Sequence, residues 1–171
     1  MEVVKMDAPL SLEERTARLK RFAASDAGFS LVGIAHIEPL DEEMRNFSEW
    51  LRRGYHAGMG YMERNADKRA DPRNILPSAK SVVVVAHNYY APHAHPNGED
   101  AQEKETLGKI SRYAWGDDYH EVVPPKLRLV AEEIERLVPG AESKVYTDTG
   151  AILEKQWATR AGIGWQGKHS N

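Results

Sequence analysis

Four consecutive valines at positions 82–85 constrain the fold of this chain more than any other feature. With Ser81 and Ala86 they form an uninterrupted run that is typical of a central β-strand covered on both faces. Residues 31–35 (Leu-Val-Gly-Ile-Ala) and 144–147 (Lys-Val-Tyr-Thr) predict two further strands. Helical segments alternate with these strands, so the sequence predicts a layered α/β domain.

The predicted helices are marked by signals at their ends. Ser11 and Glu14 form a capping box, in which each side chain satisfies a free amide at a helix start. Asp41 is expected to cap a second helix, and Pro124 or Pro125 suits the first turn of a third. The expected helices cover residues 11–28, 41–54, 124–140 and 151–161, and residues 55–80 are expected to be irregular.

The composition excludes several classes of protein. The length of 171 residues suits a single domain. No stretch approaches the ~18 consecutive apolar residues of a membrane span, and the first residues lack the layout of a secretory signal. We therefore expect a cytoplasmic protein with no membrane partner. The net charge of -3 gives no overall attraction for nucleic acid. The absence of cysteine excludes disulfides, thiolate-bound zinc, iron–sulfur clusters and a cysteine nucleophile in this chain.

Two polar loops contain residue types that bind ligands. His93 and His95 could grip a metal, but no third ligand lies nearby in the sequence, so we favour a solvated loop and predict no metal site. Residues 64–73 hold basic side chains that could bind phosphates or carboxylates. Local ion pairs with Asp67 and Asp71 are the more common explanation for such a loop.

Three further segments could carry chemistry. Residues 109–120 place aromatic and basic side chains around one glycine, which suits either stacking on a flat ring or anchoring of a loop to the core. Asp148 lies where a predicted strand meets the last helix, an edge where α/β proteins bind ligands. It either caps that helix or gives a proton to a substrate. Trp165 stands in a glycine-rich segment that suits close approach to a ligand or a buried anchor.

Taken in order, these segments resemble one family, the epoxyqueuosine reductases, which are cobalamin-dependent enzymes that finish queuosine synthesis on tRNA. Each segment alone is weakly specific, whereas four in the same order with similar spacing are quite specific. The matching segments are Lys68-Arg69-Ala70-Asp71-Pro72-Arg73 with Leu76-Pro77-Ser78-Ala79-Lys80-Ser81, then residues 109–120, then Thr147-Asp148-Thr149-Gly150, then Arg160-Ala161-Gly162-Ile163-Gly164-Trp165-Gln166-Gly167-Lys168.

The resemblance implies an oxidoreductase that removes the epoxide oxygen of epoxyqueuosine at the tRNA wobble position. It implies cobalamin as the cofactor, the anticodon loop as the partner, and a mixed central sheet flanked by helices, like the cobalamin-binding core of reductive dehalogenases. By position, Asp148 matches the family's proton donor over the cobalt. Arg69 and Ser111 match positions that contact cobalamin, although the position of Ser111 varies within the family. The residues carried over as pocket residues are Tyr119, His120, Trp165 and Lys168.

Members of this family continue into a ferredoxin-like module whose eight cysteines hold two four-iron clusters. Those cysteines are absent here, so we expect residues 1–171 to be an N-terminal cobalamin- and substrate-binding catalytic domain, truncated before the iron–sulfur domain. Its electrons would come from that missing domain or an external donor. Two other classes stay open, a non-catalytic fragment that binds tRNA or cobalamin and a flavin-dependent reductase. The candidate contacts to tRNA phosphates are Arg64, Lys68, Arg73 and Lys109.

Overall fold

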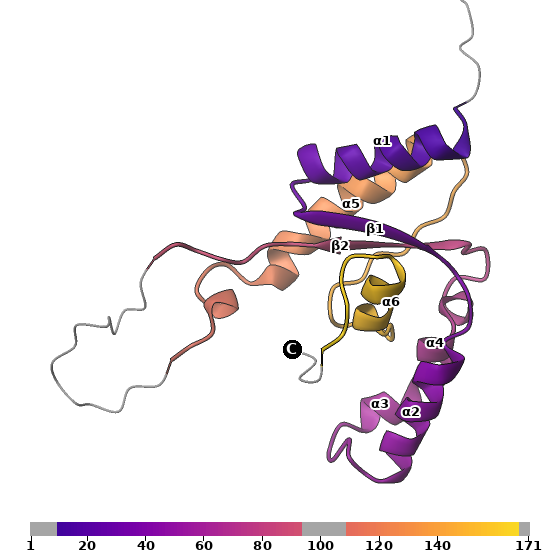
Figure 1. Ribbon diagram of the computed structural model, residues 1–171, viewed down its shortest axis with the longest axis vertical. Helices are drawn as coiled ribbons and strands as arrows, with labels where there is room; N and C mark the ends of the chain where they lie inside the picture. Colours follow the sequence, from indigo (N-terminus) through magenta and orange to yellow (C-terminus); the bar gives the residue numbers. More distant parts are fainter. Residues whose placement is uncertain (1–9, 94–108, 168–171) are drawn as a thin grey trace, which may run out of the picture.

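A two-stranded antiparallel sheet forms the centre of the computed structural model, which describes residues 10–93 and 109–167 (Figure 1). Strand β1 (Leu31–His36) pairs with β2 (Ser81–Ala86) in a register that sets Leu31 opposite Ala86 and His36 opposite Ser81. Both strands were predicted from the sequence. Within the described residues β2 has β1 as its one ladder partner, so it is not a central strand there.

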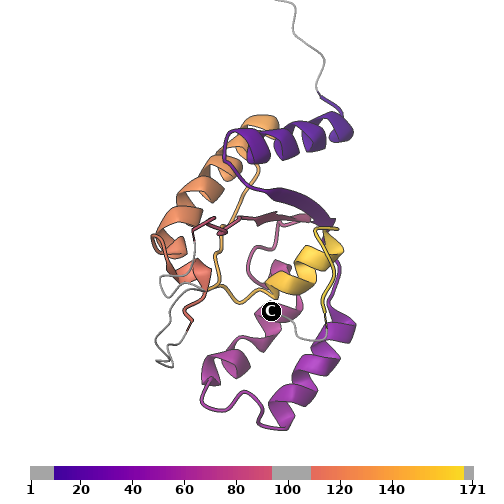
Figure 2. The ribbon, with the colours of Figure 1, turned by 60° about the vertical axis from the view of Figure 1, so that its left-hand side comes forward.

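Helices cover both faces of this sheet. Helices α1 (Leu12–Ser25) and α5 (Tyr119–Leu137) lie on one face, and α6 (Glu154–Arg160) lies on the other (Figures 1 and 2). Because successive strand side chains point to opposite faces, the valines divide between two cores. Val83 and Val85 pack with the α1–α5 core, while Val82 and Val84 pack with the core that contains Trp157. The valine run is therefore covered on both faces, as predicted.

The remaining helices form a lobe beyond one end of the sheet and a single turn on an arm. The lobe contains α2 (Asp41–Arg52), α3 (Gly60–Arg64), α4 (Ala66–Ala70) and the 3₁₀ turn η1 (Pro72–Asn74) (Figure 1). The arm is formed by residues 87–93 and 109–118 and carries η2 (Arg112–Ala114). None of the helices in the described part of the chain is long and apolar enough to cross a membrane.

The capping box at the start of α1 is confirmed, and two other predicted helix starts are wrong. Asp41 is the first residue of α2 rather than its cap. The cap position belongs to Leu40, which is fully buried and donates its amide to the Ala70 carbonyl. Helix α5 begins at Tyr119, because the Asp118 side chain accepts the His120 amide and caps the helix before the two prolines.

Other expectations also differ from the structure. The region 55–80 was expected to be irregular, but it contains α3, α4 and η1. Residues 144–147 form no ladder, and they line a cavity together with the valines of β2. The described sheet is consequently antiparallel and small, not mixed. Helix α6 starts three residues later than predicted, because residues 148–153 form bends instead of helix.

Candidate functional site

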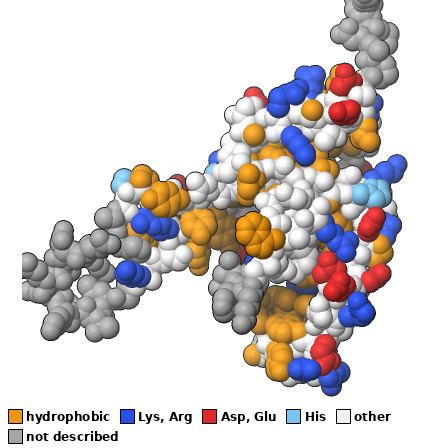
Figure 3. Space-filling view, viewed as in Figure 1, with side chains coloured by type: hydrophobic (Ala, Val, Ile, Leu, Met, Phe, Trp, Pro, Cys, Tyr) orange, Lys and Arg blue, Asp and Glu red, His pale blue; other side chains and the backbone are white. Residues whose placement is uncertain are grey.

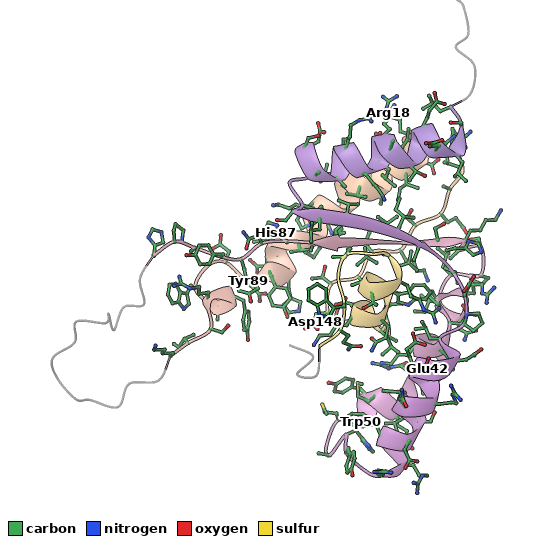
Figure 4. All side chains as sticks on the ribbon, viewed as in Figure 1. Arg18, Glu42, Trp50, His87, Tyr89 and Asp148 are labelled. Carbon is green, nitrogen blue, oxygen red and sulfur yellow. The ribbon has the colours of Figure 1, made fainter. Side chains whose placement is uncertain are left out.

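Asp148 stands at the tip of a strained turn that precedes α6 (Figure 4). Its φ is +60°, a left-handed conformation that is uncommon for a residue other than glycine. The amide of Thr149 donates to the Thr147 carbonyl at 2.6 Å and closes the turn around Asp148. The Asp148 side chain remains 65% exposed. The sequence placed Asp148 at a helix start, whereas in the structure it lies in a bend and α6 begins six residues later, at Glu154.

The first turn of α5 holds the Asp148 carboxylate. The Tyr119 hydroxyl donates to Asp148 Oδ2 at 2.7 Å, and His120 Nε2 lies 3.8 Å from the same oxygen. The hydrogen bond to Asp148 raises the pKa of Tyr119 to about 12, because ionisation would put two negative charges side by side. Asp118 in turn lies 2.9 Å from His120 Nδ1. A carboxylate only accepts, so Nδ1 of His120 carries the hydrogen and Nε2 faces Asp148.

A second carboxylate, that of Glu154, holds the backbone of the same turn. The Asp148 amide donates to Glu154 Oε1 at 2.9 Å. Glu154 is the first residue of α6, so its acidic side chain also lies at the favourable end of the helix dipole. Enclosure of its carboxyl group raises the pKa of Glu154, and the hydrogen bond from Asp148 partly offsets that rise. The residue as a whole remains exposed, so the enclosure concerns the end of the side chain.

A cavity of about 1360 Å³ opens beside the Asp148 turn. That volume exceeds the roughly 300–1,000 Å³ of ordinary small-molecule pockets. Its walls include the valines of β2 and core side chains of α1 and α5, and Tyr119, Asp148 and Glu154 belong to its lining. Three buried polar atoms without a hydrogen-bond partner belong to residues that line it, namely His87 Nδ1, Thr147 Oγ1 and Trp157 Nε1. Buried polar atoms normally have partners, so these three have hydrogen-bonding capacity that the described residues do not use.

The arm formed by residues 87–93 and 109–118 carries exposed rings and a clamped arginine. The Arg112 guanidinium lies 5.2 Å from the centre of the Tyr90 ring and 4.7 Å from that of Trp115. It also donates to the carbonyls of Ala91 and His93. Figure 3 shows hydrophobic and basic side chains side by side on this arm. These contacts hold the arm together and leave rings exposed, and the two alternatives for residues 109–120, stacking on a ligand and anchoring to the core, stay predictions.

Among the described residues, the other predicted cofactor residues make no hydrogen bond or ion pair with Asp148. Arg69 is buried, and it donates to the carbonyls of Met62 and Asn65 within the α3–α4 lobe. Ser111 is exposed and precedes η2, and its side chain makes no capping hydrogen bond. Trp165 is 89% exposed, so it is not a buried anchor. Lys168 lies outside the described residues, as does His95. These residues remain predictions, and the structure brings together only Tyr119, His120 and Asp148.

Two outcomes concern the loops that were considered for ligand binding. Arg73 donates from Nε and Nη2 to the Asp71 carboxylate, at 2.6–3.0 Å, and these hydrogen bonds lower the pKa of Asp71. Local ion pairing is therefore the correct explanation for that end of residues 64–73. Within the described residues, no cluster of three or more histidine, cysteine, aspartate or glutamate side chains could hold a metal ion.

Sequence reasoning missed Glu154 and Asp118. Asp118 carried a usable signal, since aspartate is a preferred residue at the cap position directly before a helix. Glu154 lay inside the predicted helix 151–161, where a glutamate in the interior carries no particular signal. Its partner is a backbone amide, which no residue type reveals.

Comparison with known proteins finds similarity to one family over most of the chain. Residues 69–149 match the family model described as epoxyqueuosine reductase QueG, DUF1730. This match includes Arg69, Ser111, Tyr119, His120 and Asp148, and it ends before Trp165. An epoxyqueuosine reductase of Synechocystis sp. is 45% identical over 142 residues, which are 82% of this chain and 46% of that protein.

Solved structures show the same fold. An epoxyqueuosine reductase from Bacillus subtilis, with its catalytic aspartate loop swung out of the active site, matches with a TM-score of 0.74 and 27% identity, over 94% of this chain and 41% of that one. An epoxyqueuosine reductase solved with an epoxyqueuosine-modified tRNA-Tyr stem loop matches with a TM-score of 0.73 and 25% identity, over the same shares.

The chain spans about half the length of the curated relatives that it matches. Sequence and fold agree over that half, since the family model, the curated relatives and the solved structures all carry the same description. The chain's resemblance to the epoxyqueuosine reductases is thus confirmed.

Proposed function

We propose that this chain forms the cobalamin- and substrate-facing part of an epoxyqueuosine reductase, which removes the epoxide oxygen of epoxyqueuosine in the anticodon loop of tRNA. One observation carries the proposal: the Asp148 carboxylate lies at the mouth of a large cavity, held by Tyr119 and beside His120. A positioned acid at the edge of a space for a large ligand is what protonation of a developing alkoxide requires.

The residues around the cavity fit cobalamin in size and chemistry. Its volume suits a ligand larger than ordinary small molecules, its walls are largely apolar, and the unpartnered atoms of His87, Thr147 and Trp157 suit a ligand rich in hydrogen-bonding groups. These residues, with Tyr119, would hold the cofactor, and Arg69, Ser111, Trp165 and Lys168 are proposed as outer contacts. When bound and reduced, cobalamin supplies the electrons. By analogy of fold, the cavity would correspond to the cobalamin-binding core of reductive dehalogenases.

The iron–sulfur clusters of the family do not fit this chain, because it contains no cysteine to bind them. The proposed reaction therefore needs a separate electron donor, either another polypeptide segment or a chemical reductant. Removal of an epoxide oxygen as water consumes two electrons and two protons, and the residues of this chain account for the protons only.

Asp148 and His120 are proposed to deliver protons. Asp118 orients the His120 ring so that Nε2 faces Asp148. With a proton on Nε2, His120 can pass that proton to Asp148 Oδ2. Their separation of 3.8 Å is closed by a small side-chain movement or one bridging water. Asp148 then gives the proton to the substrate oxygen, and a ligand that covers its exposed carboxyl favours the protonated form.

We also propose that the Asp148 turn moves during the reaction cycle. In the Bacillus subtilis relative, the catalytic aspartate loop was found swung out of the active site. The turn in this chain is exposed and strained at Asp148, so an outward position would relieve strain at the tip. An outward turn would admit tRNA, and an inward turn would restore the contact with Tyr119.

Spectroscopy and product analysis test this function. Purified chain is titrated with hydroxocobalamin, and saturable binding with a base-off visible spectrum is expected. With a chemical reductant and an anticodon stem–loop that carries epoxyqueuosine, mass spectrometry should detect loss of one oxygen atom. Asp148→Asn should keep cobalamin binding and lose at least about 100-fold in rate. Binding of tRNA without corrin, or corrin binding without turnover, would indicate the non-catalytic fragment, and a copurifying yellow cofactor would indicate the flavin enzyme.

A further inference from the structure

The turn that presents Asp148 contains few features that favour its shape. Its tip has a positive φ on a residue with a side chain, and only one backbone hydrogen bond, from Thr149 to Thr147, closes it. Such a conformation persists when the surroundings impose it. The contacts around the turn therefore determine whether Asp148 faces Tyr119.

One side of the turn packs against a tyrosine ring. A Cβ atom added to Gly150 would lie only 2.5 Å from Cδ1 of Tyr146, so the chain passes too close to that ring for any larger residue. Tyr146 itself is 37% exposed. This contact fixes the distance of the turn from residue 146, but it supplies no partner for the Asp148 amide.

Glu154 supplies that partner. Its Oε1 accepts the Asp148 amide at 2.9 Å, from the first position of α6. Helix α6 is itself fixed, because Trp157 is 1% exposed in the core beneath β1 and β2. A rigid helix thus holds the backbone of Asp148, while Tyr119 of α5 holds its carboxylate. The two hydrogen bonds come from different helices and act on different atoms of one residue.

We infer that Glu154 is a positioning residue, whose carboxylate holds the Asp148 amide and thereby keeps the Asp148 carboxylate on Tyr119 and facing the cavity. The role is a refinement of the proposed function, since it assigns the residue that sets the position of the proton donor. Loss of the acceptor at position 154 lets the turn relax away from α5, and the Tyr119 hydrogen bond is lost with it.

Tyr119 provides a readout of this position that is independent of turnover. Its pKa is held at about 12 chiefly by the hydrogen bond to Asp148. When the turn moves away, the phenol should titrate close to the ordinary value of about 10. Tyrosine ring carbons labelled with ¹³C report this ionisation by NMR, and Tyr119→Phe identifies the signal.

The experiment compares three variants with the wild-type chain. Glu154→Ala removes the acceptor, and Glu154→Gln removes the charge but keeps an acceptor oxygen. Glu132→Ala is the matched control, at an exposed glutamate of α5 that does not line the cavity. At a pH of about 11, Tyr119 should remain protonated in the wild type, in Glu154→Gln and in the control, and should be largely ionised in Glu154→Ala. Exchange of the Asp148 amide with solvent should become roughly tenfold faster in Glu154→Ala alone.

Two results would overturn the inference. One is an unchanged Tyr119 titration in a folded Glu154→Ala variant, with folding checked by circular dichroism. The other needs no variant and applies even if Glu154→Ala does not fold: an Asp148 amide that exchanges in the wild type as fast as an unstructured peptide has no acceptor. Because neither readout uses cobalamin or tRNA, a failure of the positioning role and a failure of the proposed reaction can be told apart.

Discussion

Tyr119 and Asp148 are joined by a 2.7 Å hydrogen bond, donated by the phenol to the carboxylate, although 29 residues separate them in the sequence. Tyr119 reaches this position because Asp118 caps α5 and makes residue 119 its first helical residue. Asp148 reaches it through the left-handed turn before α6. The contact therefore depends on two helix starts that are built independently.

The first prediction concerns the phenol. Asp148→Ala should lower the pKa of Tyr119 from about 12 toward the ordinary value of about 10, since the hydrogen bond to Asp148 is the largest cause of the rise. Some elevation should remain, because Asp118 also raises it. Ultraviolet titration of the tyrosinate band checks this, with Asp117→Ala as a neighbouring control. If the control lowered the Tyr119 pKa as much as Asp148→Ala does, general charge and not the hydrogen bond would be the cause.

The sheet and the first helix could be predicted because their signals are local. The capping box of Ser11 and Glu14 involves residues three apart, and both of its hydrogen bonds form. The valines of β2 alternate between two cores without any need to know their partners. Residues 144–147 show the limit of such signals. They carry a strand-like pattern, but a pattern does not reveal whether another strand lies at hydrogen-bonding distance.

The candidate site likewise contains residues that the sequence identified and residues that it could not identify. Asp148, Tyr119 and His120 were identified through the family resemblance, and the structure brings them together. Glu154 could not be found, because it binds a backbone amide that every residue type carries. For Trp165 the sequence left a ligand contact and a buried anchor open, and an exposure of 89% excludes only the anchor. The exposure of Trp165 depends on what contacts residues 161–167, and the sequence pattern does not reveal those contacts.

The second prediction concerns acid stability at the start of α5. Hydrogen bonds from His120, first from its amide and then from its ring, lower the pKa of Asp118 below 3.8. A lowered folded-state pKa means that the stabilisation is complete above the unfolded value and is lost as the pH falls through the folded value. Asp118→Asn keeps a capping side chain that does not titrate. Its urea midpoint should therefore fall less than that of the wild type as the pH drops below about 4, and parallel curves would refute the assignment.

The third prediction concerns Gly33 in β1. A Cβ atom there would lie 2.4 Å from the Ala161 carbonyl oxygen, 2.8 Å from Ala161 Cβ and 2.9 Å from Ile163 Cγ1. Since a backbone carbonyl cannot move aside easily, Gly33→Ala should cost about 1–3 kcal/mol or more in the free energy of unfolding. It should also displace the end of α6. Gly58→Ala is the matched control, because nothing lies within 4 Å of its Cβ position, and it should change stability by no more than about 0.5 kcal/mol.

The fourth prediction concerns tRNA binding. Arg64 and Lys68 are exposed, whereas the Arg73 guanidinium is already bound by Asp71. If Arg64 contacts a phosphate, Arg64→Ala should weaken binding of the anticodon stem–loop and reduce the slope of log K against log salt by about 1. Arg73→Ala should have a smaller effect on that slope. Filter binding over a range of salt concentrations measures both, and a larger effect at Arg73 would show that the ion pair opens on binding.

The last prediction concerns the role of the Thr147 hydroxyl in binding cobalamin. Its Oγ1 is buried without a hydrogen-bond partner in a residue that lines the cavity beside Asp148. A buried polar atom without a partner costs roughly 1–3 kcal/mol, so Thr147→Val, which keeps the shape, should leave the stability of the free chain unchanged or raise it. The same change should weaken cobalamin binding by about 3–10-fold, the value of roughly one hydrogen bond.

The matched control for this change is Thr159→Val. The Thr159 hydroxyl already donates to the Lys155 carbonyl at 3.1 Å, and the residue does not line the cavity. It should therefore leave cobalamin affinity unchanged. Thermal unfolding with and without hydroxocobalamin measures both quantities in one series, because ligand binding raises the midpoint by an amount that grows with the logarithm of the affinity. A Thr147→Val chain that loses stability in the absence of cobalamin would show that the hydroxyl serves the fold and not the cofactor.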